Sequence, residues 1–379
     1  MKEQVKEFIR CNETLLFQTL RELCAIPAPS HQEQKRAAYC KAWLEERGAQ
    51  GVYIDEALNV VFPLCCEGSD EITVFVAHTD TVFPDTEPMP YREDAEKIYC
   101  PGVADDTVSV VGLLLMAKYY LEQKLQPKGG LLFVCNSCEE GLGNLKGTRK
   151  IFADYAGRIK QFISLDSNLD VIADRCVGSH RYNVEVKTQG GHSFGAFGNR
   201  NAIAALSEIV GEIYSIQVPK RNESRTTYNV GTISGGTSVN TIAQNASMLC
   251  EYRSDDPVCL AEMEERFAAI FEKANNAETQ VLVERVGNRP CSIADPEAVE
   301  ALALRAEGII TDVLGKKPAR HSSSTDCNIP LSLGIPALCI GTNMHYGVHT
   351  REEWLEKASL VPGVEVALRF ALDLTEVEK

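Results

Sequence analysis

The chain has 379 residues, which is enough for two or three domains of ordinary size. Its 38 lysines and arginines against 53 aspartates and glutamates give a formal net charge of −15, which argues against nucleic acid or an anionic membrane surface as a partner. No apolar run is long enough to predict a membrane-spanning helix, and the first residues run into an amphipathic pattern rather than the apolar core of a signal peptide.

The first segment of the chain predicts two helices. Apolar residues at helical spacing from Val5 to Leu23 predict the first helix, which Pro27 and Pro29 end. The stretch Ser30 to Glu33 has the pattern of a capping box and predicts a second helix that ends near Gly48.

Strands and helices alternate over the rest of the first half and again at the end of the chain. Short apolar runs predict strands at 60–64, 72–77, 131–134 and 162–165, and a buried helix from Thr107 lies between the second and third of these strands. The same alternation returns after Pro290, with expected elements at 296–314 (helix), 336–340 (strand) and 355–374 (helix). This order predicts an α/β domain with a mixed, mostly parallel sheet and helices on both faces.

The middle of the chain has a different pattern. A strand at 181–188 is followed by a helix at 202–216, strands at 228–233 and 248–252, a helix at 260–274 and a strand at 281–286. The order β-α-β-β-α-β is that of a ferredoxin-like α+β unit. We therefore expect a catalytic domain formed by 1–178 and 288–379, interrupted by an inserted ferredoxin-like domain at 179–287 that serves as a lid or a dimerisation surface.

Acidic and histidine residues follow the predicted strands. Because ligands bind at the carboxyl ends of strands in open α/β sheets, these positions are candidates for chemistry. The candidates are His78 and Asp80 after one strand, the Asp105-Asp106 pair before the buried helix, Glu139 and Glu140, Asp166, and the histidines His345 and His349 near the far end.

Each of these histidine or acidic residues alone is equally typical of a turn, a helix cap or a solvent-exposed face. Together, two histidines and three carboxylates supply the nitrogen and oxygen ligands of a two-metal hydrolytic centre, with one further glutamate available as a base. We expect two divalent ions per chain, zinc first, with cobalt or manganese as alternatives because carboxylate-rich sites accept several metals. Fourteen cysteines without a secretory signal predict reduced thiols and a cytoplasmic location.

These motifs resemble those of the zinc-dependent exopeptidase and deacylase family that includes peptidase T, carboxypeptidase G, aminoacylase and acetylornithine deacetylase. The matching stretches run from Ile26 to Trp354, so the resemblance covers most of the chain. It implies a zinc-binding α/β domain with an inserted ferredoxin-like domain, in agreement with the predicted elements.

The resemblance implies roles for the strand-end residues. The metal ligands it implies are His78, Asp105, Glu140, Asp166 and His349, with Asp105 bridging both ions. Asp80 is implied to fix the ring of His78, and Glu139 to be the general base that activates a water bridging the metals. On the sequence alone either His345 or His349 could be the last ligand, and the family pattern favours His349. Family members often have a cis peptide bond after the residue that corresponds to Asp105.

The inserted domain and the last third of the chain carry further matches. His192, in Gly190-Gly191-His192-Ser193, corresponds to a histidine that stabilises the oxyanion and that comes from the other subunit in dimeric members. Asn240 and Arg253 correspond to substrate-binding residues. Ser324 and Thr325 lie in a loop that is usually rich in glycine, and we expect them to contact substrate. A homodimer through the inserted domain is therefore one expected arrangement.

The expected reaction is hydrolysis of the N-terminal peptide bond of short peptides, with a tripeptide or dipeptide as the partner. Asp166 favours this choice, because peptidases of the family tend to have Asp at this position, whereas deacylases and carboxypeptidases tend to have Glu. The opening Ile26 to Glu33 and the Asp105-Asp106 pair are most similar to the peptidase T branch, although Thr107 stands where Lys is usual. An N-acyl-amino-acid deacylase or carboxypeptidase with the same metals, and a peptide-binding protein without activity, remain as alternatives.

Overall fold

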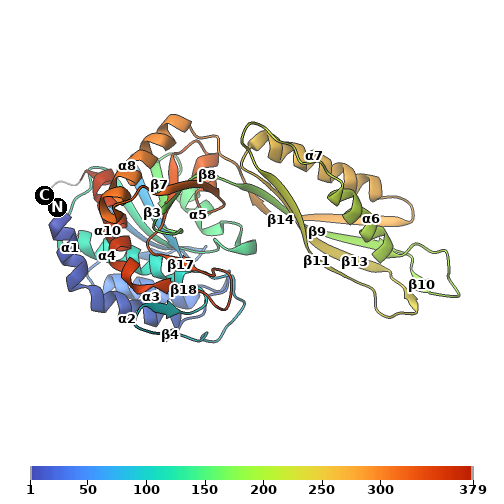
Figure 1. Ribbon diagram of the computed structural model, residues 1–379, viewed down its shortest axis with the longest axis horizontal. Coiled ribbons are helices and arrows are strands. Elements are labelled where there is room, and N and C mark those ends of the chain that lie inside the picture. The colour runs from blue at the N-terminus through green and yellow to red at the C-terminus, as the bar shows by residue number, and fades with distance from the viewer. Residues whose placement is uncertain (1, 377–379) are drawn as a thin grey trace. The chain divides into compact units, whose positions relative to one another are not determined.

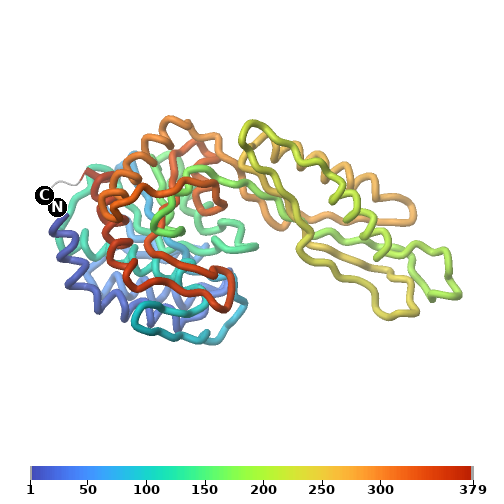
Figure 2. Tube along the Cα trace, in the orientation of Figure 1, coloured from blue at the N-terminus to red at the C-terminus, as the bar shows by residue number. Residues whose placement is uncertain are grey.

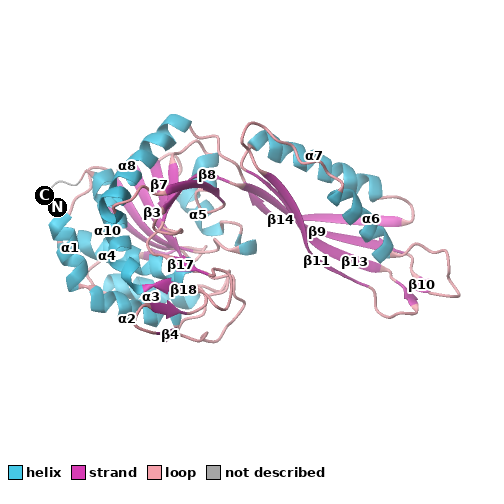
Figure 3. Cartoon of the chain, viewed as in Figure 1, coloured by secondary structure: helices cyan, strands magenta, loops and turns pink. Residues whose placement is uncertain are grey.

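The computed structural model describes residues 2–376 and divides into two compact units, each described here by itself. One unit comprises Met1–Cys176 and Ile293–Lys379, and the other comprises Val177–Ser292. The expected insert, 179–287, lies within the second unit. Figure 3 shows that each unit combines strands with helices.

The first unit is built on an eight-stranded sheet in the order β1-β2-β6-β3-β7-β16-β8-β15. Its strands are β1 (Tyr53–Ile54), β2 (Val60–Leu64), β3 (Ile72–His78), β6 (Gly130–Asn136), β7 (Ile159–Ser164), β8 (Val171–Cys176), β15 (Ala319–Ser323) and β16 (Ala337–Ile340). The central strands β6, β3, β7 and β16 are parallel to one another, whereas β2 is antiparallel to β6 and β8 is antiparallel to β16. The structure therefore confirms the mixed, mostly parallel sheet.

Eight α-helices accompany this sheet within the described part of the first unit (Figure 1). They are α1 (Lys2–Cys11), α2 (Glu13–Cys24), α3 (Gln34–Glu45), α4 (Val108–Glu122), α5 (Lys146–Asp154), α8 (Pro296–Leu314), α9 (Asn328–Ser332) and α10 (Leu360–Thr375). Helix α1 packs against α10, so the first and last helices of the chain lie side by side, as Figure 2 shows. No helix among residues 2–376 has both the length and the apolar composition needed to cross a membrane.

The helices cover both faces of the sheet. Phe75 of β3 meets Phe370 of α10 with ring centroids 6.3 Å apart, and Phe162 of β7 meets Phe152 of α5 at 5.7 Å. Phe162 is paired with Val74, the neighbour of Phe75, and successive residues of a strand point to opposite faces. Helices α10 and α5 therefore lie on opposite faces, and the central strands, buried on both sides, are continuous apolar runs.

A second, smaller sheet lies in the first unit, and the sequence did not predict it. It has the order β17-β18-β5-β4, with bounds His345–Tyr346, Trp354–Glu356, Lys97–Tyr99 and Arg92–Glu93. Because residues 354–356 pair as a strand, the helix expected at 355–374 begins only at Leu360. The expected first helix is also two helices, with Asn12 between them donating its side-chain N–H to Phe8 O at 2.8 Å.

The second unit is an antiparallel sheet with two helices. Its main sheet has the order β11-β13-β9-β14, and its elements are β9 (Gly178–Thr188), α6 (Ala202–Tyr214), β11 (Thr226–Gly235), β13 (Asn245–Ser254), α7 (Pro257–Ala274) and β14 (Thr279–Arg289). Asn201 and Asp256 cap the two helices with their side-chain oxygens. The order confirms the ferredoxin-like arrangement. A short antiparallel pair, β10 (Gly191–His192) and β12 (Thr241–Ile242), forms a separate two-stranded sheet.

A close backbone contact holds α10 against the segment that leads to His345 and His349. A Cβ atom on Gly363 would lie 1.6 Å from the carbonyl oxygen of Thr342, a distance that no side chain tolerates. Gly308 in α8 is also helical, but it is exposed and a Cβ there would meet no atom within 4 Å.

We predict opposite effects of alanine at these two glycines. Gly363→Ala should lower the free energy of unfolding by about 1–3 kcal/mol, because α10 must move away from Thr342. Gly308→Ala should raise it by about 0.5–1 kcal/mol, because alanine favours the helix and nothing obstructs its methyl group. Urea unfolding followed by circular dichroism measures both, and wild-type stability of Gly363→Ala would contradict the close contact.

Candidate metal centre

Three neighbouring parallel strands deliver acidic or histidine residues to one edge of the sheet. His78 ends β3 and is paired with Asn136, the last residue of β6, after which the chain continues to Glu139 and Glu140. Strand β7, on the other side of β3, ends at Ser164 and continues to Asp166. The carboxyl ends of these strands therefore meet at one place, as expected for a ligand site in such a sheet.

The five expected ligand residues and Glu139 form three overlapping groups, in each of which one nitrogen or oxygen atom per side chain lies within 4.8 Å of the others. These groups are His78 with Asp105 and Asp166, His78 with Glu139 and Glu140, and Asp105 with Glu140 and His349. The structure thus brings together residues spread over most of the sequence. Of the two histidines near the far end, His349 belongs to a group and His345 belongs to none among the described residues.

Asp105 lies between two histidines. Its Oδ1 is 3.0 Å from Nε2 of His78, and its Oδ2 is 3.0 Å from Nε2 of His349. Nε2 of His349 is also 3.2 Å from Oε1 of Glu140. Asp105 is therefore shared by the first and third groups, with one oxygen directed to each.

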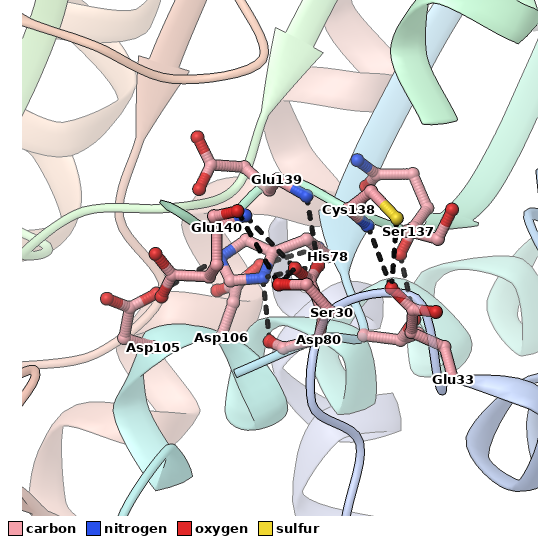
Figure 4. A network of polar contacts seen from close by, with 12 residues as sticks. Ser30, Glu33, His78, Asp80, Asp105, Asp106, Ser137, Cys138, Glu139 and Glu140 are labelled. Atoms are coloured by element: carbon pink, nitrogen blue, oxygen red, sulfur yellow. Dashed lines mark hydrogen bonds and ion pairs between the residues drawn. The ribbon is translucent and has the colours of Figure 1, made fainter. Parts of the chain in front are cut away.

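The carboxylate of Asp80 organises the segment that carries Glu139 and Glu140 (Figure 4). Its Oδ1 accepts a hydrogen bond of 3.0 Å from the backbone N–H of Glu139, and its Oδ2 accepts one of 3.0 Å from that of Glu140. The ring of His78 contacts the backbone oxygen of Asp80 at 3.0 Å, with the carboxylate farther away at 3.5 Å. Asp80 is thus placed to fix the backbone of both glutamates as well as the ring of His78.

The stretch Ser30 to Glu33 does not form the expected capping box. Helix α3 begins at Gln34, and its N-cap makes no side-chain hydrogen bond. Ser30 instead donates its hydroxyl to Oδ2 of Asp80 at 2.7 Å, and Glu33 accepts the backbone N–H of Cys138 at 3.1 Å. The local pattern was misleading because both side chains bind distant parts of the chain, and both support the segment that carries the glutamates.

The loop that carries Asp105 is held by Glu353, which the sequence analysis did not single out. Glu353 is 1% exposed, and its carboxylate accepts hydrogen bonds of 2.7, 2.8 and 3.1 Å from the backbone N–H groups of Gly102, Ala104 and Asp105. The Asp105-Asp106 peptide bond is cis, as the resemblance implied. Glu352, the residue directly before Glu353, is exposed.

The electrostatics reflect buried carboxylates held close together. Burial opposes the ionisation of Asp105, but hydrogen bonds with His349 and His78 outweigh it and lower its pKa. Burial and the Asp105 charge raise the pKa of Glu140 to about 7, and the same causes raise the pKa of Asp166 well above its ordinary value. Hydrogen bonds to Asp105 and Glu140 raise the pKa of His349 to about 10. A divalent cation would compensate this crowded negative charge, so the donor set and its electrostatics both fit a metal.

The serine-rich loop near residue 324 supports the site through its aspartate. Thr325 is buried, and its hydroxyl accepts the backbone N–H of Cys327 at 3.2 Å. Asp326, the next residue, accepts hydrogen bonds of 2.6 Å from the Asn136 side chain and 2.5 Å from the Thr148 hydroxyl. Burial and the Glu139 charge raise the pKa of Asp326 to about 7. Ser324, the other expected substrate contact, is partly buried in the same loop.

The remaining expected site residues lie in the second unit. His192 is exposed, and its Nδ1 accepts the backbone N–H groups of Phe194 and Gly195 at 3.3 and 3.2 Å. The loops of His192 and Asn240 lie together, because Ser193 N donates to Asn240 O at 2.9 Å. Arg253 donates two hydrogen bonds to Glu251, at 2.8 and 3.2 Å.

Residues 74–373 match the family described as peptidase family M20/M25/M40. The chain is 24% identical to the uncharacterized protein YqjE of Bacillus subtilis strain 168 over 381 residues, which covers 94% of this chain and 97% of that protein. A tripeptidase (SAV1512) from Staphylococcus aureus has a similar structure, with a TM-score of 0.77 and 21% identity over 96% of this chain and 99% of that one. The YXEP protein of Bacillus subtilis, a dinuclear metal binding peptidase from the M20 family, gives a TM-score of 0.66 and 17% identity over 97% and 99%.

The two adjacent glutamates at 352 and 353 provide a matched test of the Asp105 loop. Glu353→Ala should lower the free energy of unfolding by about 2–4 kcal/mol, because three buried backbone N–H groups lose their acceptor. Glu352→Ala should change it by less than about 0.5 kcal/mol, because its side chain is exposed. Thermal or urea unfolding of both variants measures the difference, and equal stabilities would show that Glu353 does not hold the loop.

Proposed function

Because the chain belongs to peptidase family M20/M25/M40 and is a metal-dependent hydrolase, we propose that it removes the N-terminal residue from peptides of two or three residues. The observation that carries the proposal is Asp105, whose two oxygens face different histidines, His78 and His349. One carboxylate shared by two ligand groups supports a pair of metal ions. The similarity to a tripeptidase supports the choice of a short peptide.

The residues proposed to hold the two ions form two sets that share Asp105. His78 and Asp166 complete one set, and Glu140 and His349 complete the other. When bound, two divalent ions would polarise the scissile carbonyl group and lower the pKa of the attacking water. We propose zinc, with cobalt or manganese as alternatives, because a mixed set of imidazole and carboxylate donors accepts all three.

Glu139 is proposed as the general base. It is 5% exposed and belongs to the group with His78 and Glu140, so its carboxylate lies beside the proposed ligands. From this position it would take a proton from the attacking water and deliver it to the departing amine. Asp80 is proposed as the residue that positions this base, because it holds the backbone N–H of Glu139.

Asp166 supports an aminopeptidase over a deacylase or a carboxypeptidase. Peptidases that resemble this chain tend to have Asp at this position, whereas deacylases and carboxypeptidases tend to have Glu. The side chain of Asp166 lies in the same group as His78 and Asp105. A longer side chain at this position would therefore move its carboxylate within the proposed metal site.

Further substrate contacts are proposed for both units. His192 is proposed to stabilise the oxyanion that develops on the scissile carbonyl, and Asn240 to bind substrate. Arg253 is proposed to pair with the carboxylate of the peptide, for which its planar guanidinium is suited. Ser324 and Thr325 remain proposed substrate contacts in the first unit.

We also propose that the chain forms a homodimer through the second unit, with His192 acting on the partner's metal site. Strand β11 is at an edge of its sheet, and its residues 231–235 are exposed. Such an edge presents unpaired backbone N–H and carbonyl groups that a second chain can bind.

Replacing the proposed base tests the catalytic assignment. Glu139→Gln should lower kcat for Ala-Ala-Ala by about 10²–10⁴-fold, because the amide cannot accept a proton from water. Its metal content, measured by plasma mass spectrometry, should equal that of the wild type, because Glu139 is not among the proposed ligands.

The same assay with N-acetyl-methionine and a carboxypeptidase substrate distinguishes the reactions. Turnover of Ala-Ala-Ala with release of the N-terminal alanine supports the proposal. Turnover of only the acylated substrate would establish a deacylase, and unchanged activity of Glu139→Gln would remove Glu139 as the base.

Mixing two inactive variants tests the action of His192 in the dimer. Glu139→Gln and His192→Ala should each be nearly inactive alone. After refolding or subunit exchange, an equimolar mixture should recover about a quarter of the wild-type activity, because half of the dimers are hybrids and each hybrid has one complete site.

Two controls make this result decisive. Each variant carried through the same exchange by itself should stay inactive, and light scattering should show dimers in every sample. Hybrid dimers without recovered activity would contradict a role of His192 in the partner's site.

A further inference from the structure

His345 lies on the face of the small sheet that is directed toward the loop of Asp105. In the β17–β18 pair, His345 is opposite Leu355, which is fully buried, and Tyr346 is opposite Trp354. Paired residues share a face, and residues two apart in a strand also share one. Glu353 directly precedes β18, two residues before Leu355, and receives the N–H groups of the Asp105 loop, against which β18 packs. His345 is therefore on the same side as this loop.

The position of His345 is fixed by the neighbouring loop that carries Asp166. The backbone N–H of His345 donates to Oδ1 of Asn168 at 2.8 Å, two residues beyond Asp166. Upstream, Gly341 packs directly on this loop, and a Cβ there would lie 2.2 Å from the oxygen of Ser167. His345 is thus held between two of the loops that carry proposed metal ligands.

The ring of His345 has one nitrogen engaged and one available. Its Nδ1 is 3.0 Å from Oδ1 of Asn343, an acceptor, so Nδ1 carries the proton and donates it. Nε2 then has a free lone pair, and no described residue donates a hydrogen bond to it. Burial lowers the pKa of His345, which keeps the ring neutral although the charge of Asp105 opposes this. His345 also stands outside the three ligand groups.

We propose that Nε2 of His345 accepts a hydrogen bond from the protonated α-amino group of the peptide, and so makes the enzyme select substrates with a free N-terminus. This inference rests on the proposed aminopeptidase function and names the group that recognises the amine. In such a substrate a single carbon separates the amine from the scissile carbonyl, so the amine must bind beside the metal ligands. A neutral imidazole next to the Asp105 carboxylate provides an acceptor in a negatively charged setting, which suits an ammonium group.

Two substitutions separate recognition from support of the fold. His345→Asn places an amide nitrogen near the position of Nδ1, which keeps a donor for Asn343 but removes Nε2. His345→Gln places a polar atom near the position of Nε2 and serves as the conservative variant. Each variant is compared with the wild type in its metal content and in its thermal unfolding, so that a folding defect is recognised.

The readout compares Ala-Ala-Ala with propionyl-Ala-Ala, which differs only by lacking the α-amino group. His345→Asn should lower kcat/KM for Ala-Ala-Ala by about 10- to 100-fold, mostly through KM, as expected for the loss of a hydrogen bond to a charged group. The inhibition constant of propionyl-Ala-Ala against Ala-Ala-Ala hydrolysis should stay unchanged. His345→Gln should recover part of the lost kcat/KM.

Each other outcome overturns a distinct statement. If His345→Asn weakens both peptides equally, or if neither kcat/KM nor KM changes, His345 does not recognise the amine. If wild-type enzyme fails to hydrolyse Ala-Ala-Ala but hydrolyses an N-acylated substrate, the aminopeptidase function itself is wrong, and the inference about His345 falls with it.

Discussion

The structure of the site depends on placing several carboxylates close together in a buried position. Like charges at this distance repel one another, and burial makes each of them harder to ionise. Two histidines reduce this repulsion at Asp105, because each of its carboxylate oxygens is 3.0 Å from a histidine nitrogen. Burial and the charge of Asp105 still raise the pKa of Glu140 to about 7, although its hydrogen bond with His349 opposes this. A pair of cations at the same place would compensate this negative charge.

The fold keeps these charges together through neutral hydrogen-bond donors. The carboxylate of Asp80 is surrounded by the N–H groups of Glu139 and Glu140 and by the hydroxyl of Ser30. Glu353 is likewise surrounded by three N–H groups of the Asp105 loop. These contacts hold the backbone of the segments that carry Glu139, Glu140 and Asp105, and so help to position their side chains.

Site residues could be predicted from the sequence where a histidine or an acidic residue ends or directly follows an apolar strand. His78, Asp80 and Asp166 follow apolar strands, so a sheet with parallel strands was enough to predict that they meet. Glu353 could not be found in this way, because its partners are the backbone N–H groups of a loop some 250 residues earlier. The residue types of that loop do not indicate which backbone N–H groups need an acceptor. Ser30 was misread for a related reason: a local pattern matched, but the actual partner is Asp80.

The most direct test of the shared Asp105 is anomalous diffraction at the zinc absorption edge from crystals of the purified, metal-loaded protein. Two anomalous peaks about 3.5–4 Å apart, with the Asp105 carboxylate between them, are the result that this account predicts. One of them should adjoin His78 and Asp166, and the other Glu140 and His349. A single peak, or two peaks that Asp105 does not join, would contradict the two-metal site.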